Sequence, residues 1–271
     1  MDFKIGVAGC GRMGLPMARA LFRTGFDTLG FDIRQSDVFP SFGDRMCFDP
    51  AAFISNRNVL ISVVRDIEQS NALLFEDQAV LVNAPELRFL IICSTLSPRY
   101  LHALRQRVPG HISLIDAPMS EAAVAAEESR LSFMLGGEEK DIDTLKPLFE
   151  AMGTKHHYMG AFTTGMATKV LNNLVAASSV ASTRLALDWA KAQGLDSDAV
   201  LAVMNDSSGQ TWFGSHFDAI EFSRDGFEID NTIGILKKDV ESALDAMPAG
   251  ARGDLPRALI EAIEHLEAWE K

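Results

Sequence analysis

The chain has 271 residues, a length that suits one large domain or two smaller ones. Its hydrophobic content of 47% is enough for a real core and excludes an intrinsically disordered protein. The net charge of −12 argues against nonspecific binding of nucleic acid, although a local basic pocket for one small anion is compatible with it.

The cysteines, histidines and apolar runs exclude several further classes of protein. Cys10, Cys47 and Cys93 are widely spaced and form neither a disulfide framework nor a CxxC metal site, which predicts a reducing, cytoplasmic setting. The six histidines show no HExxH pattern, so no metal is expected. No signal-peptide pattern and no membrane-length apolar run occurs, and we expect neither a membrane nor nucleic acid as a partner.

Short aliphatic or β-branched runs alternate with amphipathic helical patterns through the first 160 residues. This alternation predicts a doubly wound α/β fold with a mainly parallel sheet. The predicted strands are residues 4–8, 28–32, 59–63, 89–93, 113–116, 132–135 and 156–159.

The segment GCGRMG at residues 9–14 follows the first predicted strand and opens a predicted helix. A GxGxxG in this context is typical of Rossmann dinucleotide-binding domains. Gly9 would allow the tight turn, Gly11 the approach of a pyrophosphate to the backbone, and Gly14 the close packing of helix on strand. The helix N-terminus would offer amide groups and its dipole to the phosphates.

Asp32 ends the second predicted strand. An acidic residue here accepts hydrogen bonds from the adenosine ribose and repels a 2′-phosphate, so NAD is the expected cofactor. Arg34 acts in the other direction, because a nearby arginine can hold that phosphate, and NADP stays possible. The alternative to a dinucleotide site is a structural one, in which the glycines only form a turn and Asp32 is a surface aspartate with no ligand.

The alternation of predicted strands and helices ends near residues 160–165. Residues 166–193 read as one long helix without Gly or Pro, Gly194 supplies a C-terminal stop, and Asp196 is a good N-cap for the next helix. The remainder reads as helices joined by turns. We therefore expect a Rossmann domain over residues 1–163, and an all-helical domain over residues 164–271 that begins with this long helix between the domains.

Lys169 and Asn173 are four residues apart and share one face of the long helix. A lysine on an inward face would be desolvated, which would lower its pKa toward the working pH and suit a general acid/base. Asn173 could then hold a substrate hydroxyl or fix the lysine. Periodicity alone leaves open a solvated lysine on the flank of the helix.

Four segments in order carry a family resemblance: residues 9–17, DAPMS at 116–120, residues 160–173, and KDV at 238–240. They resemble the GxGxMGxxM, DAPVSGG, GxGxxxKxxxN and KDL motifs of the β-hydroxyacid dehydrogenases, which include 3-hydroxyisobutyrate dehydrogenase. STLSP at residues 94–98 also resembles the STxxP turn near the nicotinamide. The implied fold is a Rossmann domain, a long interdomain helix and an all-helical domain, with the site in the cleft.

The resemblance also implies roles for individual residues. Lys169 would be the general acid/base, Asn173 would orient the substrate, Ser120 would bind its carboxylate end, and Lys238 would contact both cofactor and substrate. Other members commonly form homodimers or homotetramers through the helical domain. The remaining candidates are Glu121 and Ala122 for the substrate, and Gly9, Gly11, Arg12, Met13, Gly14, Asp32, Arg34, Val64 and Thr95 for the cofactor.

The substrate motif departs from the family pattern. Ser120 is followed by Glu121 and Ala122 in place of glycines, and Ser129 replaces a later glycine. A carboxylate at position 121 that faces the site would repel a substrate carboxylate, which would favour a substrate that is neutral or cationic at that end. The alternative is that Glu121 points to solvent.

The expected function is hydride transfer between NAD(P) and a small 3-hydroxy acid or its semialdehyde. Two alternatives stay open. An imine or bulky-carbonyl reductase on the same scaffold would explain the altered substrate motif, but such enzymes usually lack a lysine at the position of Lys169. A non-enzymatic dinucleotide sensor would need the glycine loop but not Lys169 with Asn173.

Overall fold

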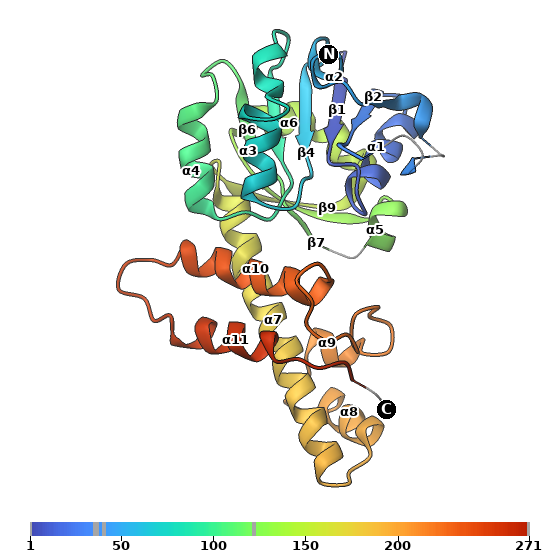
Figure 1. The fold of residues 1–271 in the computed structure, drawn as a ribbon, viewed down its shortest axis with the longest axis vertical. Coiled ribbons are helices and arrows are strands. Elements are labelled where there is room, and N and C mark those ends of the chain that lie inside the picture. Colours follow the sequence, from blue (N-terminus) through green and yellow to red (C-terminus); the bar gives the residue numbers. More distant parts are fainter. Residues whose placement is uncertain (1, 35–37, 40–41, 121–122, 270–271) are drawn as a thin grey trace. The chain divides into compact units, whose positions relative to one another are not determined.

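The computed structural model describes residues 2–34, 38–39, 42–120 and 123–269. The chain forms two compact units, Met1–Lys169 and Val170–Lys271, and the helix α7 (Thr164–Ala192) contributes to both (Figure 1). The expected domain division after residue 163 stays a prediction.

The first unit is built on one sheet. In the described part of the chain its order is β3-β2-β1-β4-β5-β6-β8-β7, and β9 pairs with β8. The first six strands in this order, from β3 at the edge through β1 to β6, run parallel to one another. The strand β8 is antiparallel to β6 and β7. The order of the first six strands is that of a Rossmann fold, so the predicted mainly parallel sheet is confirmed. The strands are β1 (Lys4–Ala8), β2 (Asp27–Phe31), β3 (Met46–Cys47), β4 (Val59–Ser62), β5 (Phe89–Ile92), β6 (Ser113–Asp116), β7 (Met119–Ser120), β8 (Leu131–Gly136) and β9 (Gly153–Gly160).

Both faces of this sheet are covered, because alternate residues of the central strands enter two separate cores. Val59 and Ile61 of β4 pack in a cluster with α1, α5 and α6, whereas Leu60 between them packs with α2, α3 and α4. A strand buried on both faces reads as a continuous aliphatic run, which is why the sequence marked it clearly. The helices are α1 (Gly14–Arg23), α2 (Pro50–Ile54), α3 (Ile67–Phe75), α4 (Pro98–Arg107), α5 (Ala123–Glu127) and α6 (Glu139–Met152), with 3₁₀ turns η2 (Gly43–Arg45) and η3 (Val80–Asn83).

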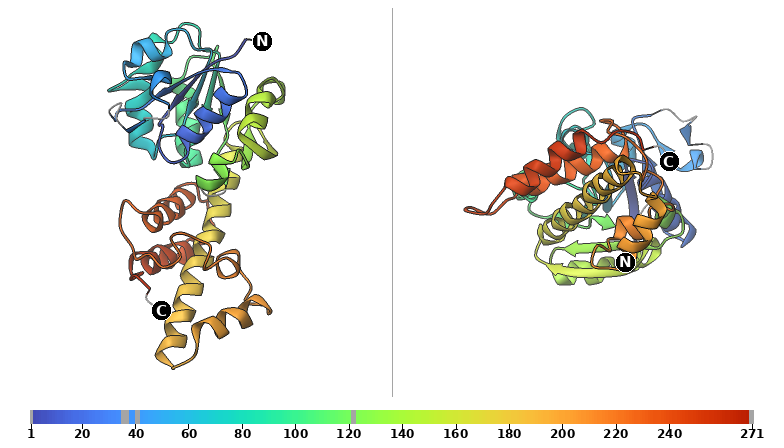
Figure 2. Two further views of the ribbon diagram at one scale, coloured as in Figure 1. Left: turned by 90° about the vertical axis from the view of Figure 1, so that its right-hand side faces the viewer. Right: turned by 90° about the horizontal axis from the view of Figure 1, so that it is seen from below.

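In its described residues, the regular elements of the second unit are all helices, joined by turns and loops. After α7 come α8 (Ser197–Asn205), α9 (Trp212–Ser215), α10 (Thr232–Asp245) and α11 (Asp254–Glu264), and α10 packs against α11 (Figure 2). Gly194 has a φ of +71°, as a C-terminal stop requires, and the carboxylate of Asp196 accepts the amide of Ala199 at 2.8 Å. Both expected helix boundaries are therefore present.

Among the described residues of the second unit, Arg184 of α7 is the largest fully buried side chain. Its guanidinium donates to the carbonyl oxygens of Ser223 and Asp225, both at 2.9 Å, and to that of Glu267. Burial lowers the pKa of Arg184, and the nearby carboxylates of Asp188 and Asp225 oppose that shift. Three backbone carbonyls thus stabilise a cation inside the helical core. Within the described residues, no helix is both long and apolar enough to cross a membrane.

Candidate active site

The glycine loop after β1 has a separate reason for each of its three glycines. Gly9 has a φ of +89°, and a β-carbon there would lie 2.8 Å from the carbonyl group of Val63. A β-carbon at Gly14 would meet the carbonyl oxygen of Gly9, so only glycine lets α1 start this close to the strand. At Gly11 a β-carbon would meet no described atom within 4 Å. The open side of Gly11, at the start of α1, fits the approach of a dinucleotide phosphate.

Asp32 follows β2 and is 8% exposed, and Arg34 already pairs with it. The Nε and Nη2 atoms of Arg34 contact the two carboxylate oxygens at 2.9 Å each, and its backbone amide donates to Oδ1 at 3.0 Å. Nη2 also donates to the carbonyl of Cys10 in the glycine loop at 3.0 Å. The two residues expected to choose between NAD and NADP therefore form one ion pair that contacts the loop.

Charge and burial act together on this part of the site. Burial raises the pKa of Asp32, but the hydrogen bonds and charge of Arg34 outweigh it and hold that pKa below its ordinary value. Burial, reinforced by the negative charge of Asp32, raises the pKa of the Cys10 thiol to about 12. Asp32 is thus an anion that can accept hydrogen bonds, whereas Cys10 stays a neutral thiol.

The other cofactor candidates lie at the ends of neighbouring strands. Val64 follows β4, and its backbone nitrogen would lie 2.9 Å from a β-carbon at Gly9. Arg12 is exposed in the loop, Met13 is half-buried beside it, and Thr95 is half-buried after β5. The structure brings the glycine loop, Asp32, Arg34 and Val64 together at the carboxyl ends of β1, β2 and β4, where open α/β sheets bind ligands.

Asp116 is a fully buried carboxylate to which the sequence assigned no role of its own. It ends β6 and accepts the backbone amides of Thr163 at 2.7 Å and Met166 at 2.5 Å, so it binds the N-terminus of α7. Burial raises its pKa to about 6, although these amide hydrogen bonds act in the opposite direction. β-Carbons at Gly136 or Gly165 would crowd its oxygens, so both glycines make room for the contact.

The substrate motif is described only in part. Ser120 is half-buried in β7 and pairs with Ser132 of β8. Glu121 and Ala122 lie outside the described residues, so the direction of the Glu121 side chain stays a prediction. Ser129, which stands at the later motif glycine, has a φ of +56°. The left-handed backbone that suits glycine is therefore retained here with a serine in it.

Lys169 and Asn173 lie one turn apart on α7, and each is 8% exposed. The solvated lysine that periodicity left open is therefore not observed. In the second unit, the Nδ2 of Asn173 donates to the Oδ2 of Asp239 at 2.5 Å. The Nζ of Lys238 lies 3.2 Å from Oδ1 of the same carboxylate. The structure thus brings Asn173 and Lys238 together through a third residue, Asp239.

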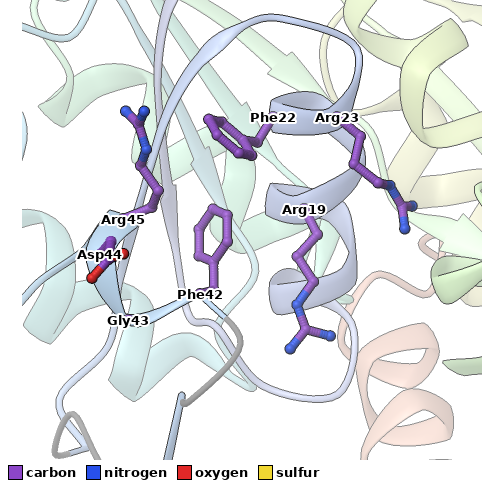
Figure 3. A pocket seen from close by; sticks show the side chains of 7 residues that line it. All are labelled: Arg19, Phe22, Arg23, Phe42, Gly43, Asp44 and Arg45. Atoms are coloured by element: carbon purple, nitrogen blue, oxygen red, sulfur yellow. The ribbon is translucent and has the colours of Figure 1, made fainter.

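A hollow of about 680 Å³ lies elsewhere on the first unit, between α1 and η2. Phe22 and Phe42 meet edge to face in it, and the guanidinium of Arg45 stacks 4.6 Å from the ring centre of Phe22. Figure 3 shows that the guanidinium groups of Arg19, Arg23 and Arg45 point in different directions, so they do not converge on one anion. None of the expected site residues lines this hollow. The described residues contain no cluster of three or more His, Cys, Asp or Glu side chains suited to a metal ion.

Comparison with known proteins identifies the family. Residues 4–160 match the family model described as the NAD binding domain of 6-phosphogluconate dehydrogenase. Residues 163–266 match the model described as NAD-binding of NADP-dependent 3-hydroxyisobutyrate dehydrogenase. The chain belongs to the β-hydroxyacid dehydrogenase family. The expected family and the expected NAD(P) cofactor are both confirmed.

Individual members of the β-hydroxyacid dehydrogenase family are similar over most of the chain. The NAD-dependent L-serine dehydrogenase of Pseudomonas aeruginosa is 30% identical over 215 residues, which cover 77% of this chain and 71% of that protein. Mitochondrial 3-hydroxyisobutyrate dehydrogenase of Drosophila melanogaster is 30% identical over 211 residues, and the match spans 64% of its length. The solved structure of Mycobacterium tuberculosis 3-hydroxyisobutyrate dehydrogenase with L-serine has a TM-score of 0.82 at 24% identity, covers 99% of this chain and 96% of its own, and shows the same fold.

Asp116 and Asp239 belong to family motifs that the sequence marked, but their contacts were not foreseen. Their hydrogen-bond partners lie 47 to 66 residues away along the chain. The only available signal was their position: Asp116 opens the DAPMS segment, and Asp239 directly follows Lys238. A buried carboxylate in a motif is the kind of residue that needs a partner, and in this β-hydroxyacid dehydrogenase both have one.

Proposed function

We propose that this protein is an NAD(P)-dependent dehydrogenase that oxidises a small 3-hydroxy acid, or reduces its semialdehyde, with Lys169 as the general acid/base. The observation that carries the proposal is the burial of Lys169 and Asn173 on one face of α7 in a chain with a complete glycine loop. The relatives named as L-serine and 3-hydroxyisobutyrate dehydrogenases support the substrate class.

The residues divide the work by their chemistry. Gly11 and the N-terminus of α1 would hold the pyrophosphate, and Asp32 the adenosine ribose. When bound, NAD(P) takes up or supplies the hydride. Neutral Lys169 would accept the proton of the substrate hydroxyl during oxidation, and its ammonium form would protonate the forming alkoxide during reduction. Asn173 would hold the reacting hydroxyl, while Ser120 and Lys238 would bind the far end of the substrate.

Lys169→Met tests the catalytic assignment. The loss of a positioned acid/base lowers kcat by about 10² to 10⁴-fold, whereas NADH affinity should stay nearly unchanged. Lys191→Met is the matched control, because Lys191 is an exposed lysine on the same helix. The measurements are NADH absorbance with a panel of hydroxy acids and semialdehydes, and fluorescence titration of NADH. Normal turnover by Lys169→Met would refute the role.

If Glu121 faces the site, its charge favours, within this substrate class, a substrate that is neutral or cationic at the end next to it. A carboxylate about 5 Å from a substrate carboxylate, at an effective dielectric near 20, opposes binding by roughly 3 kcal/mol. We therefore propose that Glu121→Gly raises kcat/KM for 3-hydroxy carboxylates at least about tenfold and does not raise it for uncharged or amine-bearing analogues. Equal effects on both groups would show that Glu121 points to solvent.

We also propose that the protein is a homo-oligomer. Leu171, Val175, Leu185 and Trp189 of α7 are 49 to 70% exposed, and their spacing places them on one face of the helix. Such an apolar stripe is typical of a surface that a second copy covers. Sedimentation of the protein and of Trp189→Glu, which places a charge in the stripe, tests this. A cytoplasmic location stays a proposal, supported by the three free thiols.

A further inference from the structure

Asp239 lies between two residues of the proposed site: one of its carboxylate oxygens accepts a hydrogen bond, and the other, which accepts none from the described residues, lies beside a cation. Asn173 of α7 donates to Oδ2 at 2.5 Å, and the Lys238 ammonium lies 3.2 Å from Oδ1. The Asp239 side chain is only 5% exposed. Burying a carboxylate costs free energy unless the charge is paired. The contacts with Asn173 and Lys238 together offset that cost.

The fold of α10 sets Asp239 in this place. Asn231 caps the helix, because its side chain accepts the amide of Gly234 at 3.0 Å. Ile233 and Val240 are fully buried and fix the face that α10 turns to the core. Asp239 directly precedes Val240 and is buried with it, whereas Lys238 keeps about a third of its side chain exposed.

The chemistry of Asp239 decides which way the Asn173 amide points. An ionised carboxylate can only accept hydrogen bonds, so the amide must turn its Nδ2 group toward Asp239. Its Oδ1 then faces away from Asp239. The Nδ2 of Asn172 donates to this oxygen at 3.1 Å, which leaves a second lone pair. Asn173 can therefore offer a fixed acceptor to a donor group of the substrate, such as a hydroxyl or an ammonium.

We propose that Asp239 is a positioning residue of the active site, which fixes the Asn173 amide with Oδ1 available to the substrate and holds the Lys238 ammonium beside it. The part that concerns the substrate rests on the proposed function. Asp239 itself does not react. It acts by removing the alternative orientation of the amide, so that the acceptor is in place before the substrate binds.

Asp239→Asn is the direct test, because an asparagine has the same shape but can either donate or accept. The orientation of Asn173 is then no longer fixed. In protein labelled with ¹⁵N in its asparagine side chains, with Asn173 assigned from Asn173→Gln, one amide proton of Asn173 should be shifted downfield and exchange slowly. Asp239→Asn should remove both features, and Asp245→Asn, an exposed control on the same helix, should retain them. Unchanged Asn173 signals in Asp239→Asn would overturn the proposal without reference to activity.

The kinetic effect should follow the same contact. A hydrogen bond to a charged group is worth about 10- to 100-fold, so kcat/KM should fall by that range in Asp239→Asn, mainly through KM. The double variant with Asn173→Ala should be no worse than Asn173→Ala alone, because both changes remove one interaction. Fully additive losses would show that Asp239 acts independently of Asn173 and would overturn the proposal.

A charge exchange covers the case in which Asp239→Asn does not fold. Asn173→Asp places two carboxylates face to face and should lower the unfolding midpoint. The exchange Asn173→Asp with Asp239→Asn restores one donor and one acceptor and should recover most of the loss, whereas no recovery contradicts the pairing. Wild-type protein that turns over no member of the panel would refute the proposed function, and the amide signals and the exchange would still decide the contact.

Discussion

A β-carbon at position 14 would lie 2.1 Å from the carbonyl oxygen of Gly9, a distance that no folded chain tolerates. Gly14→Ala should therefore force the loop away from β1, lowering both the free energy of unfolding and the affinity for NADH. Gly11→Ala should behave differently, because its β-carbon meets no described atom within 4 Å. We expect it to keep the stability of the parent while it loses NADH affinity. Urea unfolding of both variants measures stability, and NADH titration measures affinity. Normal NADH binding by Gly11→Ala would show that the pyrophosphate does not bind at Gly11.

The ion pair of Asp32 and Arg34 predicts how cofactor preference responds to mutation. Arg34→Ala should weaken NADPH binding at least about tenfold, because it removes the cation for the 2′-phosphate and leaves Asp32 to repel it. NADH binding should stay equal or improve, since the Asp32 oxygens become available to the ribose. Asp32→Ala should narrow the preference for NAD(H). A clear preference of the unaltered protein for NADP(H) would show that Arg34 dominates the pair.

Asp116 predicts an unusual dependence of stability on pH. Its pKa is about 6 in the folded chain and 3.8 as the ordinary value. The folded state therefore binds more protons between these values, and the stabilising contribution present below pH 3.8 is lost as the pH rises through about 6. The loss is on the order of 3 kcal/mol. Measured by urea unfolding from pH 4 to 6.5, the free energy of unfolding of the wild type should fall relative to that of Asp116→Asn. Parallel curves would contradict the assignment.

Ser129 predicts a stabilising substitution. A non-glycine residue in the left-handed region costs roughly 1 kcal/mol, and the φ of +56° places Ser129 there. Ser129→Gly should raise the free energy of unfolding by up to that amount in a urea titration. Arg23 donates to the Ser129 hydroxyl at 3.4 Å, so Ser129→Ala is needed as a control that removes the hydroxyl and keeps the backbone strain. Equal stability of the glycine and alanine variants would show that the strain is negligible.

The sequence predicted those parts of the fold that have a periodic signal. The strands β1 and β6 were placed to the residue, and most of the others to within one residue, because strands buried on both faces are continuous aliphatic runs bounded by turns. The predicted strand at 156–159 was shorter than β9, which begins at Gly153 and is exposed over most of its length, so it lacks that signal. The strands β3 and β7 were missed because two residues carry no period.

Within the candidate site, local geometry was predictable and distant pairing was not. The glycine spacing of the loop can be read directly from the sequence. The common face of Lys169 and Asn173 follows from the helical repeat alone. Asp239 meets Asn173 through a contact between α10 and α7, whose apolar residues share one hydrophobic core, and this contact depends on the fold of the whole helical unit. The roles of the individual site residues stay predictions until the variants above are measured.

The last described residues of the chain help to solvate the buried Arg184 cation. Its side chain is buried, and backbone carbonyls take the place that water has around an exposed arginine. One of them, that of Glu267, comes from the C-terminal segment, which is itself held by the bond from the Trp269 amide to the Arg224 carbonyl at 2.8 Å. Cleavage of the chain just before Glu267 would therefore remove one of the groups that solvate the Arg184 cation. Cleavage there would leave the buried charge of Arg184 without one of its three described carbonyl acceptors.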